Sequence, residues 1–444
     1  MIDVLSPSAR WTSLALGAAL VAFLPFSASG AQSTLPEAIN PDVTVFAFTD
    51  VGNYGGSGGF VGYAVGTRSC NRGSTPLNWC DQSTGCASGA QTNDHPVIAQ
   101  NIYRLLNGRF EQIGMSWLKH GFLSTNSSSA GCSGDSGQSC TTPPAGSNQL
   151  GVGCTDPYTS SLNGGRPLGP RSEVNATTGA YPFPFTQSGT TTTAADQRIK
   201  VATQDVDPAA NPGAIYFAEA QYIAPDDAAI GNGMNNASYR QVSVGGSPNF
   251  NISLTGTFHE KQAAIYGWPL LDPGATEVDV DIPGSVPLER FQVARRITQT
   301  GPTSWHYEYS IRNHNSDRGL QQFSIDFPDG TAFTNIGFHA VQSHSGEPYS
   351  NAAWTSSVDD PTSVISWSTE TFATNANANA LRWATMYSFW FDADSPNAES
   401  LGAKKHTLTY FKPGSPSSTP FALTLFSDGF ETSDFTVWSE TALQ

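Results

Sequence analysis

The sequence predicts an all-β fold: a disulfide-bearing, β-rich N-terminal module followed by an antiparallel β-sandwich. Charged residues make up only 13 % of the 444 residues, whereas Gly (43) and Pro (29) are frequent. Short β-branched and aromatic runs separated by such turn residues are typical of strands, because helices prefer Ala, Leu, Glu and Lys. All six cysteines fall between residues 70 and 154, which confines the expected disulfides to the first module.

The N-terminus has the pattern of a secretory signal peptide. Arg10 precedes an apolar run over residues 14–26, and the small residues 27–31 follow it. This pattern predicts cleavage after Ala31 and a secreted protein, extracellular or at the cell surface. No other segment has 18 consecutive apolar residues, so we expect no membrane insertion.

We divide the chain into a signal peptide (1–31), a β-rich module (32–285), a β-sandwich (286–413) and a linker with a C-terminal tail (414–444). In the first module, residues 96–106 show a partial helical pattern and predict one short helix. The strands expected there are 42–49, 60–67, 109–122, 199–205, 214–223, 239–244, 252–260 and 276–282.

The second module has a more regular pattern. Seven runs separated by turn residues predict two packed antiparallel sheets, because each sheet must bury its apolar face on the other. These runs are 291–298, 305–313, 321–327, 334–341, 363–368, 380–392 and 406–411. Since this module has no cysteine, we expect residues 286–413 to fold alone.

Six cysteines in an exported protein predict three disulfides. The residues are Cys70, Cys80, Cys86, Cys132, Cys140 and Cys154. Fifteen pairings are open. The local choice is Cys132–Cys140, with a long-range link back from Cys154.

Loop aromatics are the candidate binding residues. Tyr54, Tyr158 and Tyr181 stand among Gly, Pro, Asn and Ser, and Asn163 and Arg166 could hydrogen-bond hydroxyl groups. Aromatic faces stack on sugar rings, so this composition suits a neutral glycan or another polymer; such aromatics also commonly plug the ends of a sandwich. The net charge of −16 argues against nucleic acid, which requires basic clusters.

A metal site is the other candidate. His95, His120 and His259 stand beside turns or strand ends, and Asp156 follows Cys154. Neutral imidazole suits copper and zinc, so these four residues are the candidate ligands, although a lone strand histidine is more often a hydrogen-bonded scaffold residue.

Neighbouring aspartates give a third set of candidates. Asp279 and Asp281 share one face of an expected strand. They could bind calcium or keep a sheet face solvated. Paired acids are also what glycoside hydrolysis requires. The other sequence-adjacent acid pairs are Asp205 with Asp207 and Asp226 with Asp227.

Several strings resemble a group of secreted proteins of environmental bacteria. They include SWLKHGF, GCTDPYTSSLNG, LGPRSEVN, YSIRNHNSDR, HSGEPYSNAAWTSS and NANALRWATMYSFWFDAD, spread over residues 91–414. The tail DGFETSDFTVWS is similar to short C-terminal endings of other exported bacterial proteins. The resemblance implies export and carries no activity. We therefore expect a surface or matrix protein that binds a glycan or other polymer; the alternative is a secreted copper- or zinc-dependent enzyme acting on such a polymer.

Overall fold

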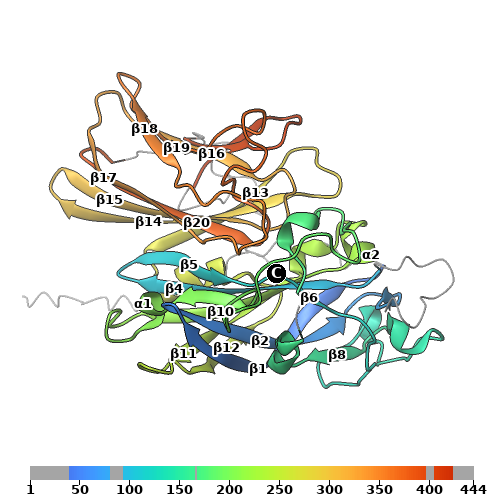
Figure 1. The fold of residues 1–444 in the computed structure, drawn as a ribbon. Coiled ribbons are helices and arrows are strands. Elements are labelled where there is room, and N and C mark those ends of the chain that lie inside the picture. The colour runs from blue at the N-terminus through green and yellow to red at the C-terminus, as the bar shows by residue number, and fades with distance from the viewer. Residues whose placement is uncertain (1–39, 81–93, 166–167, 397–404, 424–444) are drawn as a thin grey trace, which may run out of the picture. The chain divides into compact units, whose positions relative to one another are not determined.

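The computed structural model describes residues 40–80, 94–165, 168–396 and 405–423. Within these ranges the chain forms three antiparallel sheets (Figure 1) and one short strand pair, β3 (Leu77–Asn78) with β7 (Gln149–Leu150). This confirms the all-β prediction. The helices are single turns: α1 (Thr203–Val206), α2 (Pro225–Ala228), α3 (Gly267–Leu271), and the 3-10 turns η1 (Asp135–Gly137), η2 (Gly146–Asn148), η3 (Ser160–Gly164), η4 (Arg171–Glu173), η5 (Gly233–Asn235) and η6 (Ala264–Tyr266). None of the described helices is long and apolar enough to cross a membrane.

The first sheet contains most of the N-terminal half of the chain. It curls so that its last strand approaches its first: the Phe48 and Phe258 rings are 5.2 Å apart, and Thr44 Oγ1 donates to Glu260 Oε1 at 2.9 Å. The curl encloses an apolar core that includes Val45, Ile102 and other buried side chains. In sheet order the strands are β1 (Val43–Ser57), β2 (Phe60–Asn71), β9 (Ile199–Ala202), β5 (Arg109–Met115), β4 (Val97–Leu106), β10 (Ile215–Ile223), β11 (Ala237–Val244) and β12 (Ile252–His259), with β6 (Lys119–His120) on β4 and β8 (Thr155–Tyr158) on β2.

The helix predicted over residues 96–106 is wrong, because this segment is strand β4. Its side chains alternate between two environments: Ile98 and Ile102 face the core of the first sheet, whereas Tyr103 packs in a second cluster with Phe217. Apolar residues on both faces mimic a helical pattern, since a strand buried on both sides loses its simple alternation. The Asn107-Gly108 turn, with φ angles of 53° and 81°, then leads directly into β5.

The C-terminal half forms the predicted β-sandwich. Its two sheets share a core in which the Phe389 ring lies 5.3 Å from that of Phe323 and 5.4 Å from that of Trp367. The second sheet has the order β13 (Ala275–Asp281), β14 (Arg290–Gly301), β15 (Ser304–Asn313), β20 (Thr385–Ala393) and β17 (Phe333–Ala340). The third sheet has the order β18 (Thr355–Asp359), β19 (Val364–Ser368), β16 (Leu320–Asp326), β21 (His406–Tyr410) and β22 (Ser418–Phe421).

The sandwich extends beyond the limits expected from the sequence. Strand β13 precedes residue 286 and pairs with β14, while β22 follows residue 413 and pairs with β21. Both expected boundaries therefore leave an edge strand outside. Independent folding of residues 286–413 stays a prediction.

The second sheet packs against the first along strand β5. The backbone carbonyl of Phe110 accepts a hydrogen bond from Ser388 Oγ at 2.9 Å, and that of Gln112 lies 3.1 Å from His339 Nε2. The fully buried side chains of Arg312 on β15 and Glu219 on β10 also form an ion pair between the two sheets, at 3.0 Å. The two halves of the chain are thus joined by polar contacts as well as by apolar packing.

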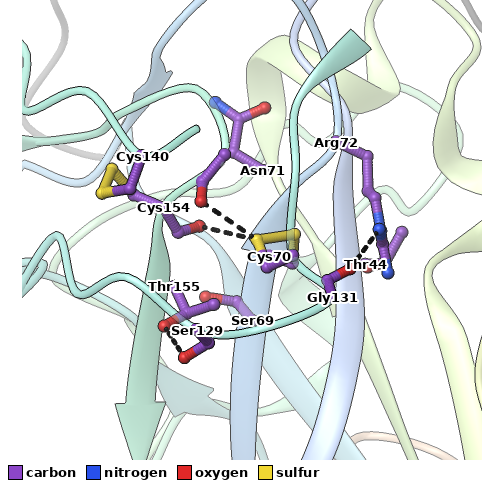
Figure 2. The surroundings of a disulfide bond; sticks show 12 residues. Thr44, Ser69, Cys70, Asn71, Arg72, Ser129, Gly131, Cys140, Cys154 and Thr155 are labelled. Carbon is purple, nitrogen blue, oxygen red and sulfur yellow. Dashed lines mark hydrogen bonds between the residues drawn. A yellow bond between two sulfur atoms is a disulfide. The ribbon is translucent and has the colours of Figure 1, made fainter. Parts of the chain in front are cut away.

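Two disulfides connect strands to loops in the first module. They are Cys70–Cys132 and Cys140–Cys154, so the predicted Cys132–Cys140 pair is wrong. The reason is strand pairing: Cys70 on β2 lies opposite Thr155 on β8, so Cys70 and Cys154 lie on neighbouring strand segments (Figure 2). Each of these two cysteines forms a disulfide with one cysteine of the loop between the strands, Cys132 or Cys140. Cys86 lies outside the described residues, so the expectation of three disulfides stays a prediction.

Candidate functional site

A polar cleft of about 240 Å³ lies between the β4–β5 hairpin and strand β15. The hairpin contributes Arg104, Leu106, Asn107, Arg109 and Glu111, and β15 contributes Glu308. The tight Asn107-Gly108 turn brings the end of β4 and the start of β5 together, so charged residues close in sequence meet at one end of the first sheet.

The charges of the cleft are paired across it. Arg109 makes two parallel bonds to Glu308, Nε–Oε2 and Nη2–Oε1, both at 2.8 Å. Arg104 donates to Glu111 at 2.8 Å and to Asp205 at 3.2 Å. Two-point pairing holds both planar groups in fixed orientations, which makes the lining of the cleft rigid.

Behind Glu308, a histidine extends the network. His306 Nε2 lies 2.8 Å from Glu308 Oε1, and its Nδ1 contacts Asp392 Oδ1 at 2.5 Å. The hydrogen bond to Glu308 raises the pKa of His306 above its usual 6.5; partial burial opposes this increase, and Asp392 adds to it. His306 thus links the carboxylates of Glu308 and Asp392.

Trp390 flanks the cleft. The Arg109 guanidinium lies 3.5 Å from the centroid of its ring, a cation–π contact. On strand β17 the residue opposite is Gly337, where a Cβ would lie 2.1 Å from the indole, so only glycine fits. The indole thus fixes Arg109, and its stacked face is not open to a ligand.

This arrangement offers donors and acceptors side by side. Guanidinium groups donate only and carboxylates accept only, so a ligand that matches both must itself donate and accept. The carboxylates are neutralised by arginines, which favours binding over proton transfer. A second hollow, beside Arg171, Tyr349 and Arg382, encloses only about 20 Å³, about one water molecule.

Of the four predicted metal ligands, the structure brings two together. His95 Nε2 lies 3.0 Å from His120 Nδ1, in a surrounding of aromatic rings that includes Phe183. Burial lowers the pKa of His120 to about 4, so its ring is neutral at physiological pH. The described residues contain no group of three or more His, Cys, Asp or Glu side chains that could hold a metal ion.

The other two predicted ligands have different partners. Asp156 accepts hydrogen bonds from the Trp79 indole at 3.0 Å and from the Thr125 backbone at 2.7 Å, and burial raises its pKa to about 6. His259 stacks on Tyr239 at 4.5 Å. The expectation that all four converge on copper or zinc is therefore not supported by the described residues.

The predicted sugar-binding aromatics are largely buried. Tyr158 and Tyr181 are only 8 % and 5 % exposed, and their hydroxyls donate to the backbone carbonyls of Phe122 and His95. Tyr54 is half-buried beneath the Arg198 guanidinium, 3.7 Å from the ring centroid. The loop composition around these tyrosines predicted exposed rings. Because their hydroxyls have hydrogen-bond partners, the rings can instead be buried at the ends of the first sheet.

Of the two remaining predicted binding residues, Asn163 gives no open surface either. Asn163 is fully buried, and its backbone carbonyl accepts a bond from Arg198 Nε at 3.2 Å. Arg166 lies outside the described residues.

The acid pairs differ in how their charge is balanced. Asp279 and Asp281 share one face, as expected, and both contact Arg290 at 2.6 Å. Asp226 and Asp227 have no such partner among the described basic residues; burial raises the pKa of Asp226 to about 6, and burial together with Asp42 raises that of Asp227 well above its usual value.

No family model matches the chain, and no curated protein gives a match. The polar cleft therefore has to be interpreted from its own geometry. Sequence reasoning did not single out Arg104, Arg109, Glu111 or Glu308. The available signal was the Asn-Gly turn flanked by charged residues, but Glu308 lies about two hundred positions away and only the packing of β5 on β15 brings it in.

Proposed function

We propose that this is a secreted binding protein that takes a polyhydroxylated ligand, a short segment of a neutral extracellular glycan, in the polar cleft. The observation that supports this is the alternation of Arg104, Glu111, Arg109 and Glu308 around about 240 Å³ of space. Sugar hydroxyl groups donate to carboxylates and accept from guanidinium groups, so each charged pair can hold a pair of neighbouring hydroxyls.

The size of the cleft favours a small part of such a ligand. Pockets for drug-sized molecules have volumes of about 300–1,000 Å³, and this cleft is slightly smaller. Two arginines and two glutamates leave its lining close to neutral, which disfavours a strongly charged polymer. The disulfides are compatible with the export proposed from the N-terminal sequence.

A direct binding measurement tests the proposal. Glu111→Gln keeps the shape of the side chain and removes an acceptor of charge-assisted hydrogen bonds, which contribute about 1.5–3 kcal/mol. Calorimetric titration with a panel of neutral oligosaccharides should therefore show an affinity loss of about tenfold or more. Glu370→Gln is the matched control, because Glu370 is exposed and its carboxylate contacts Asn375, outside the cleft. Equal affinities for both variants would contradict the proposal.

The alternative, a copper- or zinc-dependent enzyme, has one observation in its favour, the contact between His95 and His120. Zinc sites use three or four protein ligands, and two imidazoles do not complete one. The proposal of a binding protein is therefore preferred.

A further inference from the structure

His306 on strand β15 lies between two carboxylates behind the polar cleft. Its Nε2 atom is 2.8 Å from Glu308 Oε1, and its Nδ1 atom is 2.5 Å from Asp392 Oδ1. Strand pairing fixes this arrangement, because Asp392 on β20 lies directly opposite His306, and Glu308 follows two residues later on the same face of β15. Both ring nitrogens therefore have a carboxylate oxygen within hydrogen-bond distance.

The protonated form of the ring satisfies both contacts, and the neutral form does not. A carboxylate accepts hydrogen bonds without donating them, and a neutral imidazole has one N–H, whereas the imidazolium has two. In either neutral tautomer, one nitrogen directs its lone pair at a carboxylate. The other nitrogen keeps a neutral hydrogen bond, about half as strong as a charge-assisted one. The geometry thus favours the imidazolium, in agreement with the raised pKa of His306, whose largest cause is the hydrogen bond to Glu308.

The carboxylate of Glu308 also holds Arg109 in the cleft. Glu308 Oε1 contacts Arg109 Nη2 as well as His306 Nε2, both at 2.8 Å, and Oε2 accepts from Arg109 Nε at 2.8 Å. The Glu308 side chain is 4 % exposed, so few waters can replace a lost donor. When His306 loses its proton, Glu308 keeps Arg109 and at most a weaker neutral bond to the ring. The alignment of Glu308 with Arg109 therefore becomes less rigid.

The other titratable and charged groups on the neighbouring elements have partners of their own. These are Arg296 of β14 with Asp272, Arg104 of β4 with Glu111 of β5, and His339 of β17 with the Gln112 carbonyl. Among the described residues, the charged groups that contact the imidazole are Glu308 and Asp392. Both favour its protonated form. The protonation state of His306 is thus set by the two carboxylates that it joins.

We propose that His306 is a positioning residue of the polar cleft, which in its protonated form holds Glu308 in the orientation that accepts hydrogen bonds from glycan hydroxyl groups. This inference rests on the proposed function of the cleft. Glycan should bind more tightly in mildly acidic than in alkaline solution, because deprotonation loosens the pair of Glu308 and Arg109. Coupling between two binding events is reciprocal, so bound glycan should also raise the pKa of His306.

Calorimetric titration of the full-length protein at about pH 5.5 and about pH 8.5, on either side of a histidine titration, measures this effect. The probes are three neutral oligosaccharides, cellohexaose, laminarihexaose and xylohexaose. The affinity of the wild type should be about fivefold or more lower at the higher pH. His306→Gln keeps an N–H donor but does not titrate, so it should lose the difference. His259→Gln is the matched control and should retain it, because His259 is half-buried against Tyr239, outside the cleft.

A titration without glycan distinguishes failure of this inference from failure of the proposed function. The NMR signal of an imidazole that is absent in His306→Gln reports the protonation of His306. Its midpoint should lie above 6.5 and should fall in Asp392→Asn, which removes a carboxylate that favours the protonated ring. A midpoint at or below 6.5, or the same pH dependence of glycan affinity in the wild type and His306→Gln, would overturn the inference alone. Absence of glycan binding at both pH values would contradict the proposed function, and the inference with it.

Discussion

His344 provides a test of how the two halves of the chain are joined. This residue follows strand β17, is 6 % exposed, and its Nε2 lies 2.8 Å from the backbone carbonyl of Met115 at the end of β5. Burial is the main reason that its pKa falls to about 4 from the usual 6.5. The folded protein therefore keeps His344 neutral in mildly acidic solution, whereas the unfolded chain protonates it.

The size of the effect follows from proton linkage. Between about pH 6.5 and pH 4 the unfolded state binds more protons at this position, so the contribution of His344 to stability is lost as the pH falls. From about pH 7 to about pH 5, a folded pKa near 4 and an unfolded pKa near 6.5 give a loss of about 2 kcal/mol. Replacement by a side chain that does not titrate removes this loss.

The variant His344→Gln retains a donor for the Met115 carbonyl. At about pH 7 it should be less stable than the wild type by about 1–3 kcal/mol if the hydrogen bond is not reformed. At about pH 5 that deficit should shrink by about 2 kcal/mol, or reverse. Urea unfolding at both pH values gives the two differences. A deficit that is independent of pH, or that grows in acid, would refute the assignment of a buried, neutral His344.

Four further predictions follow. Arg312→Met should cost about 3–5 kcal/mol in urea unfolding, because it leaves the buried Glu219 carboxylate unpaired. Removing Cys70–Cys132, whose loop spans 62 residues, should cost about 4 kcal/mol, against about 3 kcal/mol for Cys140–Cys154 with 14. If His120 is a scaffold residue, His120→Ala should lower the melting temperature equally with and without a chelator. If His120 is a metal ligand, copper or zinc should raise the melting temperature of the wild type only. Residues 286–413 should unfold cooperatively if they fold alone, and the longer fragment 272–423, which retains β13 and β22, should be more stable.

The arginine, disulfide and fragment predictions each have an outcome that would contradict them. For Arg312, the double variant with Glu219→Gln should recover part of the loss, and an additive loss would argue against a coupled pair. A reversed order of the two disulfide variants would contradict the loop-length account. A fragment 272–423 that lacks cooperative unfolding would show that the sandwich depends on its contact with β5.

Local sequence pattern was sufficient for much of the fold. Alternation and turn residues predicted strands β12, β14 and β15 close to where they lie. Strand β10 was also predicted, although it is buried along almost its whole length. The same reasoning failed for β4, which is buried on both faces. It also missed the edge strand β18, whose residues are all exposed and therefore carry no apolar signal.

The candidate site was less accessible to sequence reasoning. The proximity of His95 and His120 was expected from strand ends, and the pairing of β4 with β6 produces it. The cysteine pairing and the contact of Arg109 with Glu308 depend on which strands become neighbours, and local pattern does not determine that. Burial of Tyr158 and Tyr181 depends on partners for their hydroxyls, which a loop-like composition hides.

The hydrogen bonds along strand β5 constrain how the sheets can move. The carbonyls of Phe110 and Gln112 are spaced two residues apart, and each meets its own donor, Ser388 or His339, from the facing sheet. Apolar surfaces alone would tolerate a small slide, because their contacts are interchangeable. Here a shift by one residue would turn the carbonyls away and leave several buried polar groups unpaired at once, each at a cost of about 1–3 kcal/mol. Only one alignment of the two sheets therefore satisfies these hydrogen bonds. The same alignment fixes the width of the cleft at the end of β5.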